Sequence, residues 1–291
     1  MILSEAFTRI NYALRGTDDD VPSSGSEEYA QWLSVMNRKK DELYYDAGKQ
    51  WSYIYKATQP NEIGTVATTG TTTLTGTGTY FTDYKAGDKI TVSGETERTI
   101  DTISSDTSLT VTVAFSNTDT GLTFTRNTIV DDTVQSYSVH RSLIAPSDKV
   151  FVLDTNGDKI FLDLIHPQER DYTNQQVHLS GGNPQVLTFT EDLISGDRYD
   201  GGSIVIPGYY IPADLSAATD VLPVPDPNWL VLATAAELAF VEIVYEDRAE
   251  TLNARANALW KTMVARNSRN TYDSPRKTPY NVKRIRSPRV R

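Results

Sequence analysis

Residues 64–126 read GTVATTGTTTLTGTGTYFTDYKAGDKITVSGETERTIDTISSDTSLTVTVAFSNTDTGLTFTR. Threonine accounts for 21 of these 63 residues. Its β-branched side chain favours the pleated surface of a sheet, so the stretch predicts a strand-rich unit rather than a linker. The expected strands alternate in polarity and are punctuated by glycines; they span residues 71–75, 88–92, 98–103 and 108–113.

Apolar side chains in this stretch are numerous enough to form a small core of their own. They are Leu74, Phe81, Ile90, Val92, Ile100, Ile103, Leu109, Val111 and Phe115. A disordered threonine-rich stalk would lack them. We therefore expect residues 64–126 to be an inserted small β-barrel or β-sandwich domain.

Helices are predicted on the amino-terminal side of this stretch. Ser4 is the expected N-cap of a first helix that ends at Gly16, and Ser26 is the expected N-cap of a longer second helix. Residues 50–56, which include Trp51, alternate in the manner of a strand.

On the carboxyl-terminal side, short strands are predicted first and a long helix last. The strands are expected at residues 134–139, 149–154, 159–165, 186–190 and 203–207. Asn156-Gly157 is a strong signal for a hairpin between two of them. Asp226 and Pro227 are the expected cap and first residue of a long, alanine-rich helix whose apolar stripe resumes after Glu246-Asp247-Arg248.

Together these elements predict an α+β fold, in which the amino- and carboxyl-terminal helices form a bundle. The middle of the chain is β-rich and includes the inserted domain. We expect a discontinuous core made of residues 1–63 and 127–267, the inserted β domain at 64–126, and an extended basic arm at 268–291.

The arm is expected because the end of the sequence differs in charge from the rest. Residues 266–291 contain nine basic residues and one acidic residue, Asp273, which gives this segment a charge of +8. The whole chain carries −10, so residues 1–265 carry −18. Pro275, Pro279 and Pro288 oppose helix formation. We expect this arm to become ordered on an acidic surface, which could belong to nucleic acid, another protein or a neighbouring copy.

Composition excludes several classes of protein. The chain has no cysteine, which excludes disulfides, thiolate metal sites and a cysteine nucleophile. No stretch approaches the roughly 18 consecutive apolar residues of a membrane span, and the first residues lack the features of a signal peptide. The acidic body argues against a general nucleic-acid binder.

Signals for a metal site are weak. The three histidines lie far apart in the sequence and form no HExxH-like pair; they are His140, His166 and His178. Asp154, Asn156 and Asp158 imitate the first half of a calcium loop, but the glycine comes too early and the final glutamate is missing, so a hairpin is favoured. Asp18-Asp19-Asp20 is expected to be a solvated charge run rather than an ion site.

Signals for catalysis are equally weak. Gly181-Gly182 and Gly201-Gly202 lack the spacing and the following helix of phosphate loops, so turns are expected. No GxSxG elbow occurs. Asp192, Asp197 and Asp200 could supply a glycosidase-like pair, but any acidic chain contains such pairs by chance. The sequence therefore predicts no enzymatic activity, no cofactor and no bound metal.

Tyrosine is abundant, with sixteen residues, and four tryptophans accompany it. Several tyrosines cluster at the expected ends of elements; they are Tyr44, Tyr45, Tyr53, Tyr55, Tyr209 and Tyr210. Such amphipathic side chains suit both the rim of a core and a subunit interface, and the two interpretations are compatible.

One part of the sequence resembles a known family. Residues 208–215 read GYYIPADL, and the segments that follow are Thr219-Asp220, Val224-Pro225-Asp226, Trp229-Leu230-Val231, Ala235-Ala236-Glu237-Leu238-Ala239, and Met263 with Asn267. Set after amino-terminal helices with an aromatic stripe and a β-rich middle, this order resembles the head-tail connector proteins of tailed bacteriophages, also called portal adaptors. The resemblance covers residues 1–56 and 127–272 as an architecture, and its specific part spans residues 203–267.

The resemblance implies a ring, commonly of twelve subunits, that sits under the portal, with each carboxyl-terminal arm in a groove of the portal protein. The portal-binding residues would then be Arg276, Lys277, Tyr280, Lys283, Arg284, Ile285, Arg286, Arg289 and Arg291. Residues 64–126 depart from this plan and resemble small β-domains of phage tail, baseplate and fibre proteins.

The expected protein is thus a structural component of the virion neck or tail, assembled in the host cytoplasm. It would join the portal to a tail tube, nozzle or stopper protein, and its acidic wall would let genomic DNA slide past without sequence-specific binding. Residues 64–126 would dock tail fibres or neck proteins. The alternatives are a carbohydrate- or receptor-binding appendage protein that uses residues 64–126, a nucleic-acid-binding protein that uses the arm, and an enzyme.

Overall fold

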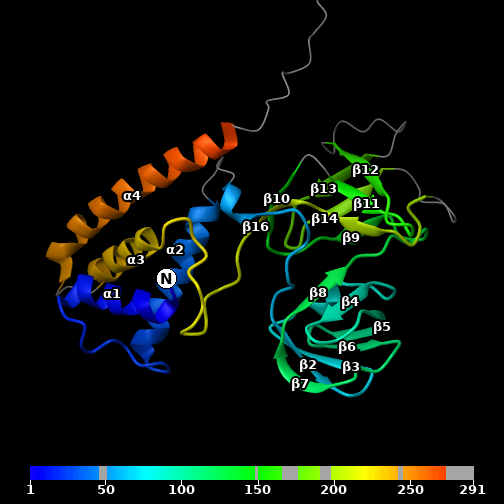
Figure 1. The fold of residues 1–291 in the computed structure, drawn as a ribbon, viewed down its shortest axis with the longest axis horizontal. Helices are drawn as coiled ribbons and strands as arrows, with labels where there is room; N and C mark the ends of the chain where they lie inside the picture. Colours follow the sequence, from blue (N-terminus) through cyan, green and yellow to red (C-terminus); the bar gives the residue numbers. More distant parts are fainter. Residues whose placement is uncertain (46–50, 148–149, 166–175, 191–197, 242–244, 273–291) are drawn as a thin grey trace, which may run out of the picture. The chain divides into compact units, whose positions relative to one another are not determined.

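A computed structural model of the chain describes residues 1–45, 51–147, 150–165, 176–190, 198–241 and 245–272. It confirms the predicted α+β class, because helices lie near both ends of the sequence and strands lie between them (Figure 1). The described residues form two compact units. The helical unit contains residues 1–43, 51–53 and those from 215 onward, and the β unit contains residues 54–214 together with Tyr44 and Tyr45. The domain limits expected from the sequence stay a prediction.

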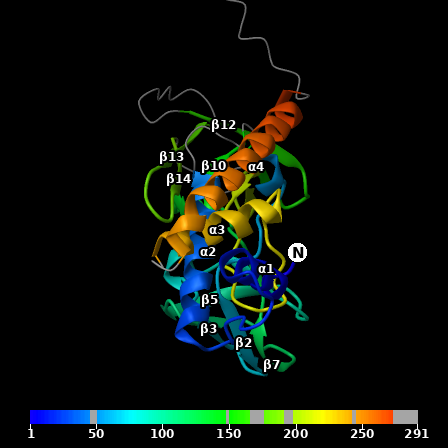
Figure 2. The same ribbon diagram turned by 90° about the vertical axis from the view of Figure 1, so that its left-hand side faces the viewer.

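Four helices make up the helical unit. They are α1 (Leu3–Arg15), α2 (Glu27–Tyr45), α3 (Pro227–Val241) and α4 (Glu246–Tyr272). α3 packs against both α1 and α4, and Figures 1 and 2 show these three helices side by side. Helices from the two ends of the sequence therefore share one bundle, as predicted.

Aromatic side chains fill the interior of the helical unit. The rings of Phe7 in α1 and Trp32 in α2 are 5.6 Å apart. Trp260 in α4 meets Trp229 in α3 at 5.6 Å and Trp51 at 5.7 Å. All four tryptophans of the chain lie in this unit, so tryptophan fluorescence reports on the helical unit alone.

Three of the predicted helix ends are confirmed. Ser26 caps α2, because its Oγ accepts a hydrogen bond from the backbone N–H of Tyr29 at 3.1 Å. Asp226 caps α3 in the same way through the N–H of Asn228 at 3.0 Å. Gly16 ends α1 with a φ of 79°, a left-handed conformation that glycine adopts without steric cost.

The predicted cap of α1 is wrong. Ser4 lies inside the helix, which begins at Leu3. The N–H groups of Leu3 and Ser4 donate to the carbonyls of Asp220 at 2.8 Å and Ala218 at 3.0 Å. Backbone from the segment before α3 thus satisfies the free donors of the first turn, so no side-chain cap is needed.

The single long helix predicted after Asp226 is also wrong, because α3 and α4 are separate helices. Glu246 and Asp247 lie in the first turn of α4, where the positive end of the helix dipole stabilises negative charge. Trp229, near the start of α3, touches Trp260 in the second half of α4, so the two helices run antiparallel. The charged break in the sequence marks a helix start.

The strand predicted at residues 50–56 is reduced to β1 (Tyr55–Lys56), which follows a short 3-10 helix, Ser52–Ile54. Trp51 is buried and its indole Nε1 donates to the carbonyl of Leu43 at 3.0 Å. The N–H of Ser52 donates to Oδ1 of Asn267 at 3.1 Å. These bonds tie Trp51 and Ser52 to the helical unit, and the pairing with β16 begins only at Tyr55.

In the β unit, seven strands form one antiparallel sheet, called here the curled sheet. They are β2 (Thr65–Thr69), β3 (Thr73–Thr77), β4 (Lys89–Val92), β5 (Arg98–Ser105), β6 (Ser108–Val111), β7 (Thr118–Leu122) and β8 (Phe124–Asn127). Their order is β7-β2-β3-β6-β5-β4-β8. β7 and β8 form opposite edges, yet only Thr123 separates them in sequence. The sheet must therefore curl until its two edges approach each other at this point.

The curled sheet encloses a core of its own. Its buried members are Val66, Leu74, Phe81, Tyr84, Ile90, Val92, Ile100, Leu109, Val111, Phe115 and Phe124, and Ile103 and Leu122 pack against them. Every core residue predicted from the threonine-rich stretch belongs to this set. The expected barrel or sandwich is a single curled sheet with the short 3-10 helix η2 (Phe81–Asp83).

A six-stranded sheet forms the second part of the β unit, in the order β15-β11-β12-β13-β14-β9. Its strands are β9 (Ser136–Ser138), β11 (Val150–Leu153), β12 (Lys159–Leu164), β13 (Gln176–Ser180), β14 (Val186–Phe189) and β15 (Ser203–Val205). A smaller sheet joins β1, β16 (Gly208–Tyr210) and β10 (Leu143–Pro146). Each strand predicted after residue 126 overlaps an observed strand.

The predicted hairpin joins β11 to β12, with Leu153 opposite Lys159. The connecting loop is five residues long rather than two. The Asp154 carboxylate accepts the N–H groups of Asn156 and Asp158 at 2.8 Å each, and these bonds hold the pKa of Asp154 below its usual value. The residues that imitate a calcium loop therefore shape a turn.

A pH-dependent contribution to the stability of the helical unit is expected from Glu237. Burial raises its pKa, but hydrogen bonds from Lys39, at 2.8 Å, and from Arg38 lower it by more, so the net pKa is depressed. A depressed carboxyl pKa stabilises the fold above the unfolded pKa, about 4.3, and this contribution is lost as the pH falls below it. Glu237→Gln should cost about 1 kcal/mol or less at pH 7, and this cost should shrink as the pH falls from about 4.3 toward the depressed pKa of the folded state.

Urea unfolding followed by tryptophan fluorescence between pH 7 and pH 3 measures this difference. Glu42→Gln is the matched control, because Glu42 also pairs with Lys39 but its side chain is half exposed. A cost of Glu237→Gln that stays constant down to pH 3 would contradict the assignment.

Candidate functional site

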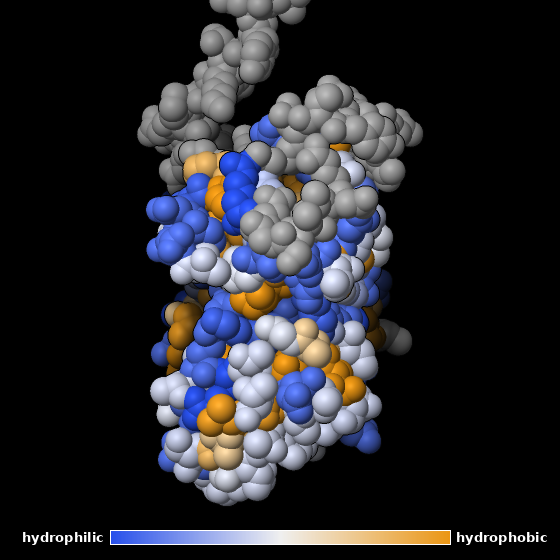
Figure 3. Space-filling view, turned by 90° about the vertical axis from the view of Figure 1, so that its right-hand side faces the viewer, coloured by the Kyte–Doolittle hydropathy of each residue, from blue (hydrophilic) through white to orange (hydrophobic). Residues whose placement is uncertain are grey.

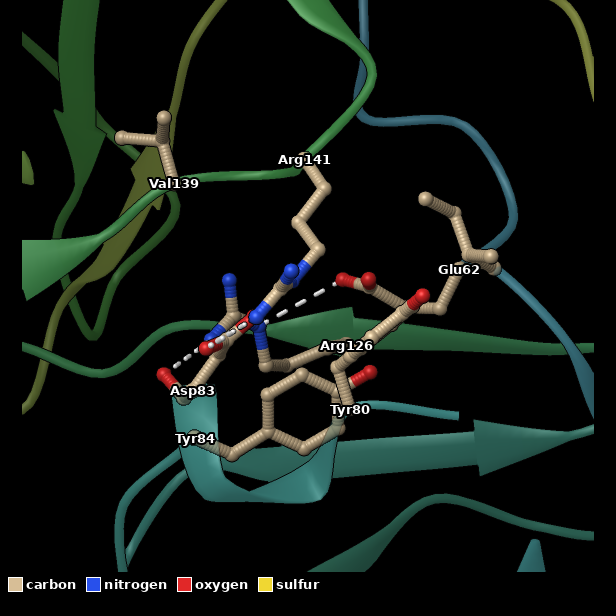
Figure 4. A pocket seen from close by; sticks show the side chains of 8 residues that line it. Glu62, Tyr80, Asp83, Tyr84, Arg126, Val139 and Arg141 are labelled. Atoms are coloured by element: carbon tan, nitrogen blue, oxygen red, sulfur yellow. Dashed lines mark hydrogen bonds and ion pairs between the residues drawn. The ribbon is translucent and has the colours of Figure 1, made fainter. Parts of the chain in front are cut away.

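A group of charged side chains in contact with one another lies where the curled sheet joins the six-stranded sheet. Three segments meet there: residues 61–63, which lead into the curled sheet; residues 80–88, around η2; and residues 137–142, in and after β9. Figure 4 shows Arg126, from β8, among side chains of all three segments. We call this group the Arg126 joint.

Arg126 is buried because of its place in β8. Side chains alternate along a strand, so Arg126 faces inward like Phe124, two residues before it, and its side chain is 2 % exposed. Nη1 donates to the carbonyl of Asp83 at 3.1 Å, and Nη2 donates to the carbonyl of Ser138 at 2.9 Å. The guanidinium also lies 4.4 Å from the ring centroid of Tyr84.

Two buried carboxylates balance the charge of Arg126. Oε1 of Glu62 is 3.4 Å from Nε, an ion-pair distance without hydrogen-bond geometry, and Oδ2 of Asp88 is 4.0 Å from Nη1. Asp88 accepts the N–H groups of Ile129 and Lys85. Burial raises the pKa of Asp88, Arg126 lowers it, and the net pKa stays above the usual value. Arg126 therefore stabilises the ionised form of the Asp88 carboxylate against the effect of burial.

A second arginine approaches from the opposite side. Arg141, after β9, forms two hydrogen bonds to the carboxylate of Asp83, at 2.5 and 3.1 Å. Its guanidinium lies 3.8 Å from the ring centroid of Tyr80. Figure 4 shows Arg141 reaching from the loop after β9 toward η2. Because the pair is bidentate, it fixes both the distance and the angle between the guanidinium of Arg141 and the carboxylate of Asp83.

Lys85 and Tyr137 form a further contact in the joint. Nζ of Lys85 lies 4.3 Å from the ring centroid of Tyr137 in β9, a cation-π distance. Burial lowers the pKa of Lys85 and raises the pKa of Tyr137 to about 12. The tyrosine hydroxyl therefore stays protonated at neutral pH, and it donates to the carbonyl of Asp131.

His140 completes the joint in a defined tautomer. Its Nδ1 accepts the backbone N–H of Ser142 at 3.1 Å, which places the ring proton on Nε2. Nε2 then donates to the carbonyl of Asn61 at 3.0 Å, with Oε2 of Glu62 at 3.6 Å. The imidazole thus fixes the segment that leads into the curled sheet.

The chemistry of this arrangement is structural. A small cavity is lined by Glu62, Ile63, Tyr80, Asp83, Tyr84, Arg126, Val139 and Arg141 (Figure 4). The carboxylates and guanidinium groups around it point at one another and at backbone groups, so they are already engaged. In the described part of the chain, no group of three or more histidine, aspartate or glutamate residues could hold a metal ion.

Several residues singled out from the sequence lie outside the described residues. These are all nine expected portal-binding residues of the arm, from Arg276 to Arg291, together with His166, Asp192 and Asp197. His178 lies in β13, where it pairs with Thr188 of β14. The acidic run Asp18-Asp19-Asp20 is an exposed loop after α1.

The clustered tyrosines divide between core and surface. Tyr44 and Tyr210 are buried. Tyr45 is 63 % exposed, Tyr53 51 % and Tyr55 42 %. The core interpretation therefore holds for Tyr44 and Tyr210, and a subunit interface at the exposed tyrosines stays a prediction.

Local sequence patterns do not predict the Arg126 joint, because its members come from segments that are distant in sequence. One local signal was present. Phe124 and Arg126 occupy the same face of a short strand, and a charged residue at a core-facing position needs a buried partner.

Arg126→Met should destabilise the β unit by roughly 3–5 kcal/mol, because it leaves two buried carboxylates without their cation. Adding Glu62→Gln should recover part of this loss, since one of the uncompensated charges is removed. Hydrogen exchange of the β unit's core amides, followed across the urea transition, measures the β unit, and tryptophan fluorescence, which reports on the helical unit, serves as an internal control that should not change. Lys89→Met, which removes an exposed cation from the neighbouring strand, should cost no more than about 0.5 kcal/mol. If Arg126→Met and Lys89→Met destabilise the β unit equally, the burial of Arg126 does not explain its contribution to stability.

Comparison of the sequence with known proteins gives no match, either to a model of a protein family or to a curated protein. Among the described helices, none is both long and apolar enough to cross a membrane.

Proposed function

We propose that the protein is a structural component of a bacteriophage virion, a ring-forming head-tail connector. In this role about twelve copies surround the DNA passage, join the portal to a tail tube, nozzle or stopper protein, and reach the portal with residues 268–291. The protein performs no catalysis. Support comes from the family resemblance of residues 203–267 and from the features of the two units.

The observation that carries the proposal is the packing of α4. Its buried side chains Leu252, Ala256 and Met263 lie along the middle of the helix, and Nη1 of Arg248 donates to the carbonyl of Leu14 at 2.6 Å. The helix is therefore anchored from its first turn onward, and it leads directly into the basic segment. A terminal arm that binds a partner transmits force to the body only if the helix before it is anchored, and α4 is anchored in this way.

Subunit contacts have candidate residues on the helical unit. Phe240 is 55 % exposed, Val241 60 %, Tyr12 60 % and Val221 65 %. Large apolar side chains at the surface favour association with other proteins. A ring of identical copies would bury such residues.

The surface of the curled sheet favours a protein partner over a carbohydrate. Figure 3 shows this surface in its lower half as mostly pale, with separate orange patches, as expected for threonine and a few exposed apolar residues such as Val113. Most aromatic side chains of the curled sheet lie in its core and are not available at the surface, since Phe81, Tyr84, Phe115 and Phe124 are buried. Tyr80 carries the guanidinium of Arg141 on its ring. Stacking platforms for sugars are thus scarce, so we favour docking of fibre or neck proteins.

The charge distribution suits a DNA passage. Residues 1–265 carry −18, and residues 266–291 carry +8. A negative wall repels phosphate and lets a duplex move without being held. Basic arms on the outside bind protein instead.

Negative-stain electron microscopy and native mass spectrometry of the purified protein, alone and mixed with portal rings from the same phage, test this function. We expect rings of about twelve times the 32.4 kDa chain mass, alone or once portal is present. A protein that stays monomeric under both conditions would overturn the proposal.

Truncation after Asn267 should leave both units folded but abolish binding to portal rings, because the basic arm is removed. The matched control replaces the basic residues from Arg276 to Arg291 with glutamine and keeps the length of the arm. Loss of binding in both variants assigns the interaction to charge. Unchanged portal binding by the truncated protein would show that residues 268–291 do not bind the portal.

A further inference from the structure

We propose that Arg126 is the positioning residue of the curled sheet. It joins the curled sheet and the six-stranded sheet into one rigid body, so that a partner bound to the curled sheet is held at a set angle to the rest of the β unit. The inference goes beyond a docking role for residues 64–126, and it holds for the isolated protein whether or not that role is correct.

A module that enters and leaves the chain through two connecting segments ordinarily pivots on them. Both connections are bonded here. On the way in, the N–H of Glu62 donates to the carbonyl of Phe124 at 2.8 Å. On the way out, the N–H of Ile129 donates to Oδ1 of Asp88 at 3.0 Å, and the N–H of Val130 donates to the carbonyl of Gly202 at 2.8 Å.

Arg126 adds a direct link across the boundary. One planar guanidinium binds the carbonyl of Asp83, in η2 beside the curled sheet, and the carbonyl of Ser138, in the six-stranded sheet. Because the donors of this group have a fixed geometry, tilting the curled sheet away from β9 breaks one of the two bonds. An ammonium group on a flexible stem has rotatable donors and would not impose this fixed geometry on its acceptors.

Two more side chains cross the same boundary in opposite directions. Arg141 reaches from the loop after β9 to the carboxylate of Asp83, and Lys85 reaches from the curled sheet to the ring of Tyr137. With Arg126 they make three separate points of attachment. Rotation about any one of these points disturbs the other two.

Burial makes the link persistent. The side chains of Arg126 and Glu62 are 2 % and 6 % exposed, so water and salt compete weakly for their charges. Local opening would place uncompensated charge in an apolar interior, which is strongly unfavourable. The joint should therefore behave as a fixed elbow rather than as a hinge.

The absence of cysteine permits a direct test on the full-length chain. Thr73→Cys in β3 and Asp163→Cys in β12 introduce two exposed positions on strands, one in each sheet. Spin labels on these cysteines give the distance distribution between the sheets by double electron-electron resonance. Labelled chains are diluted with excess unlabelled protein, so that distances between copies do not contribute.

The expected result is one narrow distribution for the doubly labelled parent, and a distribution roughly twofold broader or more for Arg126→Met. Lys89→Met should match the parent. Hydrogen exchange of the curled sheet's core amides shows whether each variant stays folded. If Arg126→Met unfolds, Arg126→Lys keeps the buried charge but lacks the planar fork, and it should still broaden the distribution. A broad distribution in the parent, or a narrow one in every folded Arg126 variant, would overturn the inference.

Discussion

The β unit depends on one buried cation. The guanidinium of Arg126 donates to backbone carbonyls on both sides of the joint, at Asp83 and at Ser138, and it also compensates the carboxylates of Glu62 and Asp88. In an interior where a lone charge is costly, each member of such a set requires the others. The contacts of Arg141 and Lys85 lie around this centre. A polar joint of this kind has a specific geometry, which an apolar contact between two sheets would not impose.

The helical unit is held together by different means. Its interior is aromatic, and its charged contacts, such as Glu237 with Arg38 and Lys39, lie nearer the surface. Backbone groups of residues 218–222 also pair with residues 1–4, which fastens the start of α1 to the segment before α3. For a connector, the helical unit, with its aromatic core and anchored helices, would carry subunit contacts and the arm. The β unit would present the curled sheet at a fixed angle to its own six-stranded sheet.

Much of the architecture could be predicted from local patterns. The threonine-rich stretch revealed its own core because alternation and glycine punctuation are local properties, and Ser26, Asp226 and Gly16 revealed helix ends for the same reason. The missed features depend on distant partners. Ser4 lost its capping role to the carbonyls of Ala218 and Asp220, the strand at residues 50–56 was shortened by contacts with Leu43 and Asn267, and the Arg126 joint assembles residues from three separate segments. The charged residues at Glu246 and Asp247 are a local signal for a helix start, but the apolar stripe on both sides of them predicts one continuous helix instead of α3 and α4.

The joint also bears on how such a chain can change during evolution. The curled sheet enters and leaves near one place, since the N–H of Glu62 donates to the carbonyl of Phe124 in β8, the exit strand, and a module with adjacent ends is easily gained or exchanged. Here exchange is constrained. Asp83, Asp88 and Arg126 belong to the module, while Glu62, Ser138 and Arg141 belong to its host. A substitute lacking the matching charges would leave a carboxylate and a guanidinium stranded in the host, so module and host are expected to vary together or not at all.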